Sequence, residues 1–176
     1  MGEIRSFAPE KLIMGILTSR PHRLRELEEA LVREYGPIDY RSRQIPFTYT
    51  DYYSEEMGPD IQRLFLSFAD LVSPDRLAEI KLRSNRIEEI FIEEGRRKVN
   101  IDPGMLSLGK LILASTKDNA QRIPLSRGIY AEITLIYRKK KYRPLPWTYP
   151  DYQSDEYLPV LTHIRDIYKQ QLESTE

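Results

Sequence analysis

The 176-residue sequence contains no cysteine and has only two histidines. Without cysteine the chain has no disulfide, no thiolate zinc site and no cysteine nucleophile. His22 and His163 lie far apart in the sequence, which argues against a histidine metal site or a Ser-His-Asp triad. We therefore predict no metal site, and any metal ion would have to be a hard ion bound by carboxylates such as Asp51, Asp102 or Glu132.

Long apolar segments and common nucleotide-binding motifs are absent too. The sequence has no Gly-x-x-x-x-Gly-Lys-Ser/Thr, no Gly-x-Gly-x-x-Gly and no His-Glu-x-x-His. The longest apolar stretch, Leu12 to Leu17, has the length of a strand and is far too short to span a membrane. Because no run of signal-peptide type precedes it, we expect a cytoplasmic protein with no membrane partner.

The charge of the chain is balanced, with 27 Lys plus Arg against 27 Asp plus Glu. A net charge of zero argues against nucleic acid as a partner, although a local basic patch is compatible with it. The run from Arg138 to Arg143 is such a patch. It has two interpretations, a contact to nucleic acid or a solvated hairpin end with lysines that protect a sheet edge, and we favour the second.

Hydrophobic periodicity predicts alternating strands and helices. The strands are expected at 11–18, 38–47, 62–72, 98–102, 110–115 and 128–138, and the helices at 21–35, 74–94 and 156–172. This order predicts an α+β fold, a largely antiparallel sheet with packed helices, with a ferredoxin-like core and a C-terminal strand-strand-helix extension. No linker composition divides the chain, so we expect a single domain over 1–176.

The second helix has a well-marked predicted start and end. Ser73 is predicted to cap it, Pro74 to occupy its first position, and Gly95 to end it. Its apolar stripe is predicted to face inward and consists of Leu77, Ile80, Ile87, Ile90 and Phe91. The short strand 98–102 is predicted to end at the turn Pro103-Gly104.

Two similar aromatic–acidic segments occur at 46–56 and 146–156. They read Pro-Phe-Thr-Tyr-Thr-Asp-Tyr-Tyr-Ser-Glu-Glu and Pro-Trp-Thr-Tyr-Pro-Asp-Tyr-Gln-Ser-Asp-Glu, with seven of eleven positions identical. One interpretation is a structural corner, in which each aspartate caps a turn and the tyrosines cover apolar surface. The alternative is that both segments converge on one cleft, where tyrosines stack on a ligand and carboxylates orient it.

Other polar residues stand out within the predicted strands and helices. Glu132 stands in the middle of a predicted strand, so we expect it to pair with a cation or to face a cleft. Lys81 lies on a polar stripe of the second helix. The predicted ligand-binding residues are Tyr49, Asp51, Tyr52, Lys81, Asn100, Asp102, Lys117, Arg122, Glu132, Trp147, Tyr149 and Asp151.

Four stretches together resemble an uncharacterised bacterial family classed as a domain of unknown function. They are Arg97 to Gly104, Leu113 to Lys117 with Arg122, Gly128 to Leu135 and Pro146 to Tyr152, and the likeness covers essentially the whole chain. Members are sometimes labelled GTP-binding proteins, a label that requires P-loop residues this sequence lacks. The resemblance supplies no catalytic residues, and Ile123-Pro124 stands where the family pattern would have isoleucine followed by an aromatic residue.

The function these residues favour is that of a small anionic-ligand-binding domain with an aromatic-rimmed polar cleft. Arg122, Lys117 and Lys81 would supply positive charge, and tyrosines and Trp147 would form the walls. One alternative is a magnesium-dependent hydrolase or transferase that acts on a phosphorylated substrate through Asp102 and Glu132. Another is a structural or assembly protein. The sequence predicts no particular cofactor, ligand identity, catalytic residue or oligomeric state.

Overall fold

A central antiparallel sheet organises the molecule, of which the computed structural model describes residues 2–174. Its strands are β1 (Glu10–Thr18), β2 (Ile38–Arg41), β3 (Ile45–Pro46), β4 (Gln62–Val72), β7 (Val99–Leu106), β8 (Lys110–Ser115), β9 (Ile123–Ser126), β10 (Ile129–Arg138) and β11 (Lys141–Pro144). Seven follow the order β11-β10-β8-β7-β1-β4-β2, while β3 pairs with β4 and β9 with β10. Each of these pairings is antiparallel.

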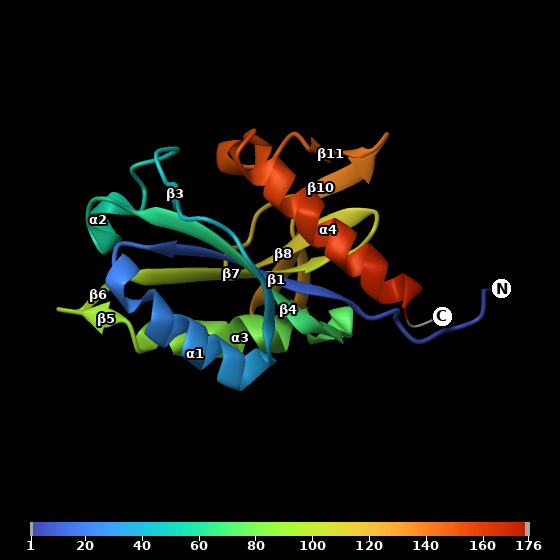
Figure 1. The fold of residues 1–176 in the computed structure, drawn as a ribbon, viewed down its shortest axis with the longest axis horizontal. Helices are drawn as coiled ribbons and strands as arrows, with labels where there is room; N and C mark the ends of the chain where they lie inside the picture. Colours follow the sequence, from blue (N-terminus) through green and yellow to red (C-terminus); the bar gives the residue numbers. More distant parts are fainter. Residues whose placement is uncertain (1, 175–176) are drawn as a thin grey trace.

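Helices cover both faces of this sheet (Figure 1). The helices are α1 (Leu24–Tyr35), α2 (Ser54–Met57), α3 (Leu77–Glu89) and α4 (Tyr157–Glu173), with 3-10 turns at Pro21–Arg23, Pro74–Arg76 and Pro150–Gln153. The helices α1 and α3 lie on one side, and α4 crosses the other. No helix within residues 2–174 is long and apolar enough to cross a membrane.

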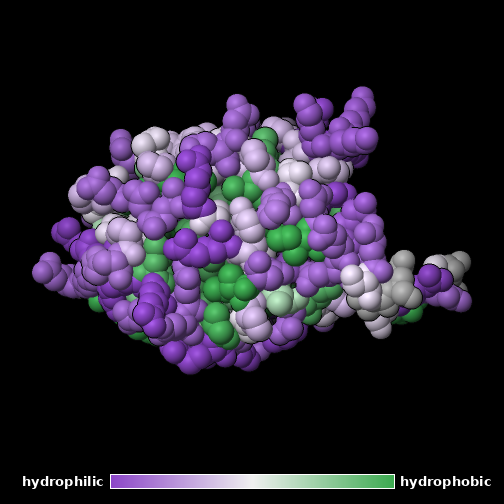
Figure 2. Space-filling view, in the orientation of Figure 1, coloured by the Kyte–Doolittle hydropathy of each residue, from purple (hydrophilic) through white to green (hydrophobic). Residues whose placement is uncertain are grey.

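The core is divided between the two faces because side chains alternate along each strand. From β1, Leu12, Met14 and Ile16 pack with α1 and α3. Ile13, between them, packs on the opposite face with residues of α4 such as Leu161. The face of the molecule shown in Figure 2 carries mostly hydrophilic residues, with hydrophobic ones in separate patches.

The α+β class and the largely antiparallel sheet are confirmed. The chain runs β1–α1–β2–β4–α3–β7, and these strands lie side by side in the order β7-β1-β4-β2. That arrangement supports the ferredoxin-like description, which stays a prediction. The strands β8, β10 and β11 extend the sheet beyond β7, and α4 ends the described chain.

The start and the end of α3 differ from the prediction. The side chain of Ser73 makes no capping hydrogen bond within the described residues; instead its backbone carbonyl accepts the N–H of Arg76 at 3.1 Å, because the helix opens with a 3-10 turn. The helix ends at Glu89, and Ile90 is 55% exposed, so its predicted inward position is wrong. A hairpin of β5 (Ile92–Glu93) and β6 (Arg96–Arg97) replaces the predicted last turn.

Two-residue turns close three hairpins within residues 2–174, of which the sequence indicated only the one in the basic run 138–143. In each turn both residues have positive φ, as the primed hairpin turns require: Glu94-Gly95, Arg127-Gly128 and Lys139-Lys140. The first two place glycine at the second position, where a side chain would be strained. The third has lysine there and joins the paired strands β10 and β11, so the basic run does lie at a hairpin end.

Candidate functional site

A cleft of about 780 Å³ lies where two neighbouring strands stop pairing. β7 and β8 pair from Gly104 to Leu106, opposite Leu111 to Leu113. Beyond this point they separate, and the cleft is lined by Asn100 and Asp102 of β7 on one side and by Ser115 of β8 on the other. The divergence of two strands of one sheet therefore creates the cleft.

Pro103 does not end β7 as predicted, because it lies at this separation. The N–H and C=O of Ile101 bond to groups on the side of β7 away from β1, and Pro103, two residues on, has the same orientation. The N–H that proline lacks would thus point toward β8 and not into the ladder with β1. A residue that usually marks a turn is tolerated inside this strand.

The helix α3 replaces the missing strand partner of Ile101. Glu88 accepts the N–H of Ile101 at 2.7 Å, and Lys81 donates to its carbonyl at 2.6 Å. Both side chains are 7% exposed, so these two polar residues of α3 are buried and not solvated. Because unpaired backbone groups are costly when buried, these two residues have a structural role at the cleft.

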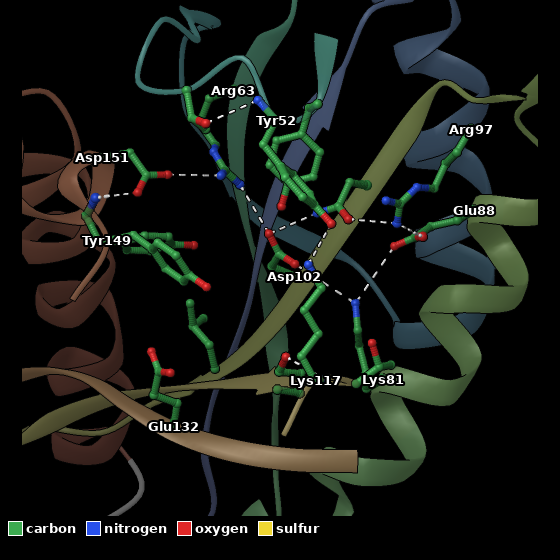
Figure 3. Close-up of a pocket in the computed structure, with 18 of the residues that line it drawn as sticks. Tyr52, Arg63, Lys81, Glu88, Arg97, Asp102, Lys117, Glu132, Tyr149 and Asp151 are labelled. Carbon is green, nitrogen blue, oxygen red and sulfur yellow. Dashed lines mark hydrogen bonds and ion pairs between the residues drawn. The ribbon is translucent and has the colours of Figure 1, made fainter. Parts of the chain in front are cut away.

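An alternating series of charges runs along the cleft wall from Asp151 to Arg97 (Figure 3) and continues to Glu56, so that it connects the two aromatic–acidic segments. It passes from Asp151 of the second segment to Glu56 of the first. Successive N···O contacts are 3.2, 3.6, 4.0, 3.8, 3.0 and 2.9 Å, in the order Asp151, Arg63, Asp102, Lys81, Glu88, Arg97 and Glu56. Each carboxylate in this series therefore has a cation beside it.

Arg63 is the most enclosed cation of this series. Its Nη2 donates to Asp151 at 3.2 Å and its Nε donates to the hydroxyl of Tyr157 at 3.2 Å. Four aromatic rings surround its guanidinium at 5.6 to 5.8 Å: those of Phe47, Phe65, Tyr152 and Tyr157. Such a cation is held by charge and by ring faces together.

The opposite wall is formed by the β8–β9 connection and by β10. Glu132 pairs with Arg122 at 3.0 Å and so has the cationic partner expected for a carboxylate in mid-strand. Arg122 also donates to the hydroxyl of Tyr149 at 3.3 Å, and Lys117 donates to the hydroxyl of Tyr52 at 2.7 Å. Two cations of one connection thus each hold a tyrosine of a different aromatic–acidic segment.

Burial changes the titration of two carboxyl groups at the cleft. It raises the pKa of Asp151 above its usual value, while Arg63 and the N–H of Tyr152 oppose the increase. Burial likewise raises the pKa of Glu88, against the effects of Lys81, the N–H of Ile101 and Arg97. Both groups resemble carboxyls of functional sites in this respect, although buried structural ion pairs have the same property.

The two aromatic–acidic segments share a backbone turn but differ in side-chain environment. The N–H of Ser54 bonds to the carbonyl of Asp51 at 2.9 Å, and that of Ser154 bonds to the carbonyl of Asp151 at 3.1 Å. The side chain of Asp151 is buried, where it accepts the N–H of Tyr152 and pairs with Arg63. Asp51 is exposed. The second segment therefore supplies a buried carboxylate that the first does not.

The structure brings ten of the twelve predicted ligand-binding residues to this one cleft. They are Tyr49, Tyr52, Lys81, Asn100, Asp102, Lys117, Arg122, Glu132, Tyr149 and Asp151. Asp51 and Trp147 are not among the lining residues. The indole of Trp147 instead donates to the carbonyl of Ile133 at 2.8 Å, which fixes it against β10.

Sequence analysis missed two central residues of the cleft, Arg63 and Tyr152. Arg63 is a charge near the start of a strand that is otherwise strongly apolar, which is the signal that identified Glu132. Tyr152 has the same position in the second segment as Tyr52 has in the first. Both signals are present in the sequence.

The groups at the cleft are suited to hydrogen bonding and charge recognition. Within residues 2–174, no group of three or more His, Asp or Glu side chains gathers as a metal site would require. The lining combines five cations with five carboxylates, so its formal charge is balanced: Arg63, Lys81, Arg97, Lys117 and Arg122 against Glu88, Glu89, Asp102, Glu132 and Asp151. Tyrosine rings extend this polar lining toward its mouth, where Tyr52 and Tyr149 are exposed.

Comparison with known proteins identifies a family but no activity. No curated protein and no solved structure matches the chain. One family model matches, over residues 8–168, which is most of the sequence. The chain therefore belongs to the family described as Domain of unknown function (DUF4416).

Proposed function

We propose that the protein binds a small anionic ligand in the cleft between β7 and β8. The observation that carries this proposal is the convergence of both aromatic–acidic segments and the β8–β9 connection on one space of about 780 Å³. Cavities of that size hold a metabolite-sized molecule, and binding sites commonly combine aromatic walls with a few fixed polar groups.

The preference for an anion comes from a surplus of donors and not from net charge. Lysine has three N–H donors and arginine has five, whereas a carboxylate only accepts. Lys117 uses one donor on Tyr52, and Lys81 uses one on Ile101. Together with Nη1 of Arg63, which has no hydrogen-bond partner within residues 2–174, the remaining N–H groups of the two lysines form a set of unused donors at the cleft. Acceptor-rich ligands such as phosphates and carboxylates match it.

A thermal-shift screen of nucleotides, sugar phosphates and dicarboxylates, each with and without Mg²⁺, tests this function. A stabilisation that does not need the metal supports a binding domain. A stabilisation that needs Mg²⁺ would favour the alternative of an enzyme acting on a phosphorylated substrate. The absence of any shift would contradict ligand binding and favour the role in assembly.

The exposed Lys117 offers a variant that leaves the core intact. Lys117→Met removes a charged donor at the mouth, and we expect it to weaken an anionic ligand about tenfold, the value of one such hydrogen bond. Lys169→Met is the matched control, because Lys169 forms an exposed pair with Glu173 on α4. Equal affinities for the two variants would contradict the placement of the anion.

A further inference from the structure

Two buried polar atoms on the cleft lining have no hydrogen-bond partner within residues 2–174. They are Nη1 of Arg63 and the hydroxyl of Tyr152. Each of the two residues is 2% exposed. More than about 90% of buried polar groups in proteins have a partner, so two such atoms at one site need an explanation.

The two atoms lie together against Gly15 of β1. A Cβ added to Gly15 would lie 2.8 Å from the hydroxyl of Tyr152 and 2.9 Å from Nη1 of Arg63. Glycine at this position therefore leaves the space that both groups occupy. Because both residues also line the cleft, the two unpaired atoms belong to its floor.

A carboxylate acceptor completes this group of atoms. Oδ2 of Asp102 lies 3.6 Å from Nη1 of Arg63, which is too long for a hydrogen bond. The side chain of Asp102 is 26% exposed, compared with 3% for Arg63, so the carboxylate is open to the cleft. A group bound here meets N–H and O–H donors on one side and a carboxylate on the other.

We propose that this floor is a subsite for a hydroxyl group of the ligand, which makes the ligand an anionic sugar or polyol. A ligand hydroxyl accepts hydrogen bonds from Nη1 of Arg63 and from the hydroxyl of Tyr152 and donates one to Asp102, so it satisfies all three groups. A phosphate or carboxylate oxygen only accepts, and Asp102 would repel it. The anionic part of the ligand then lies toward Lys117 at the mouth. This inference rests on the proposed function and specifies its substrate class.

Calorimetric titration with ribose 5-phosphate and with inorganic phosphate tests the inference. We expect ribose 5-phosphate to bind at least about tenfold more tightly than phosphate, since it adds hydrogen bonds to charged groups. Tyr152→Phe removes one hydroxyl without changing shape. We expect it to weaken ribose 5-phosphate about fivefold or more and to leave phosphate binding unchanged.

Tyr142→Phe is the matched control, because the hydroxyl of Tyr142 is also buried, has no hydrogen-bond partner among the described residues and lies outside the cleft lining. It should change neither affinity. Gly15→Ala is a second variant, expected to displace both unpaired groups and abolish the preference for the sugar.

The possible outcomes separate this inference from the function on which it rests. Equal binding of the two ligands would overturn the hydroxyl subsite and leave anion binding intact. Equal effects of Tyr152→Phe and Tyr142→Phe would also overturn it. If neither ligand binds, both the subsite and the proposed function fail.

Discussion

Replacing Arg63 by methionine isolates the energetic role of the buried cation at the cleft. The side chains of Arg63 and Asp151 are 3% and 8% exposed, so the methionine variant leaves a carboxylate in an enclosed site without its partner. Breaking a buried ion pair in this way lowers the free energy of unfolding by about 3–5 kcal/mol. The loss should come from charge more than from packing, because methionine still fills the space between the surrounding rings.

A double variant separates the ion pair from the packing. In Arg63→Met with Asp151→Asn, neither member of the pair is charged, and we expect the loss to shrink to about 1–2 kcal/mol. The coupling between the two positions would then be about 2 kcal/mol or more, within the range measured for contacting residues.

Urea denaturation at pH 7 measures these differences. Arg25→Met is the control, because Arg25 and Glu29 form a pair whose side chains are 92% and 55% exposed. It should change the free energy of unfolding by less than about 0.5 kcal/mol. If the methionine variant fails to fold, Arg63→Lys, which keeps the charge, should give a smaller loss. A loss from Arg63→Met no larger than that of the control would refute the reasoning, as would strictly additive effects in the double variant.

Three further predictions can be checked by urea denaturation as well. Lys140→Gly should stabilise the protein by about 1 kcal/mol, because it relieves a left-handed backbone conformation in the β10–β11 turn. Gly104→Ala should destabilise it by about 1–3 kcal/mol, since the new Cβ would lie 2.6 Å from the carbonyl oxygen of Ile112 across the β7–β8 pairing. Glu88→Gln should alter the pH dependence of the free energy of unfolding. Burial raises the pKa of Glu88, so the stability from its protonated form is complete below its usual pKa of 4.5 and is lost as pH rises through the raised value. The stability of wild type relative to Glu88→Gln should therefore fall as pH increases above 4.5, and a constant difference would contradict this.

Much of the fold could be predicted because local patterns define it. The strands β4 and β8 have the predicted bounds, 62–72 and 110–115, because each is a β-prone segment with few charges between polar flanks. The bounds of α1 and α4 agree closely with those predicted from their apolar stripes. The hairpin that replaces the end of the second predicted helix was missed because Ile90 and Phe91 continue the helical spacing, and only Phe91 is buried.

The cleft could be predicted in its residues but not in its shape. Sequence similarity between 46–56 and 146–156 indicated that the segments share a role, and ten predicted residues do lie at one cleft. The separation of β7 and β8 arises from contacts between distant positions, among them Lys81 and Glu88 on the backbone of Ile101. No local pattern in the sequence encodes such a contact. Asp51 and Asp151 occupy the same position in the two similar segments, but one is exposed and the other is buried. This difference also depends on the residues that surround each turn.

The short β7–β8 pairing has a mechanical consequence. Three residue pairs join the two parts of the sheet, so hydrogen bonds between strands hardly restrain the width of the cleft. The restraint comes from the helices: α3 contacts β7, β8 and β10, and α4 contacts β1 and β11. A ligand that fits the cleft therefore adds to the forces that hold α3 and α4 in place, and one too large must displace them. Ligand affinity and helix docking are then parts of a single equilibrium, so amide exchange in both helices should slow when the cleft is filled.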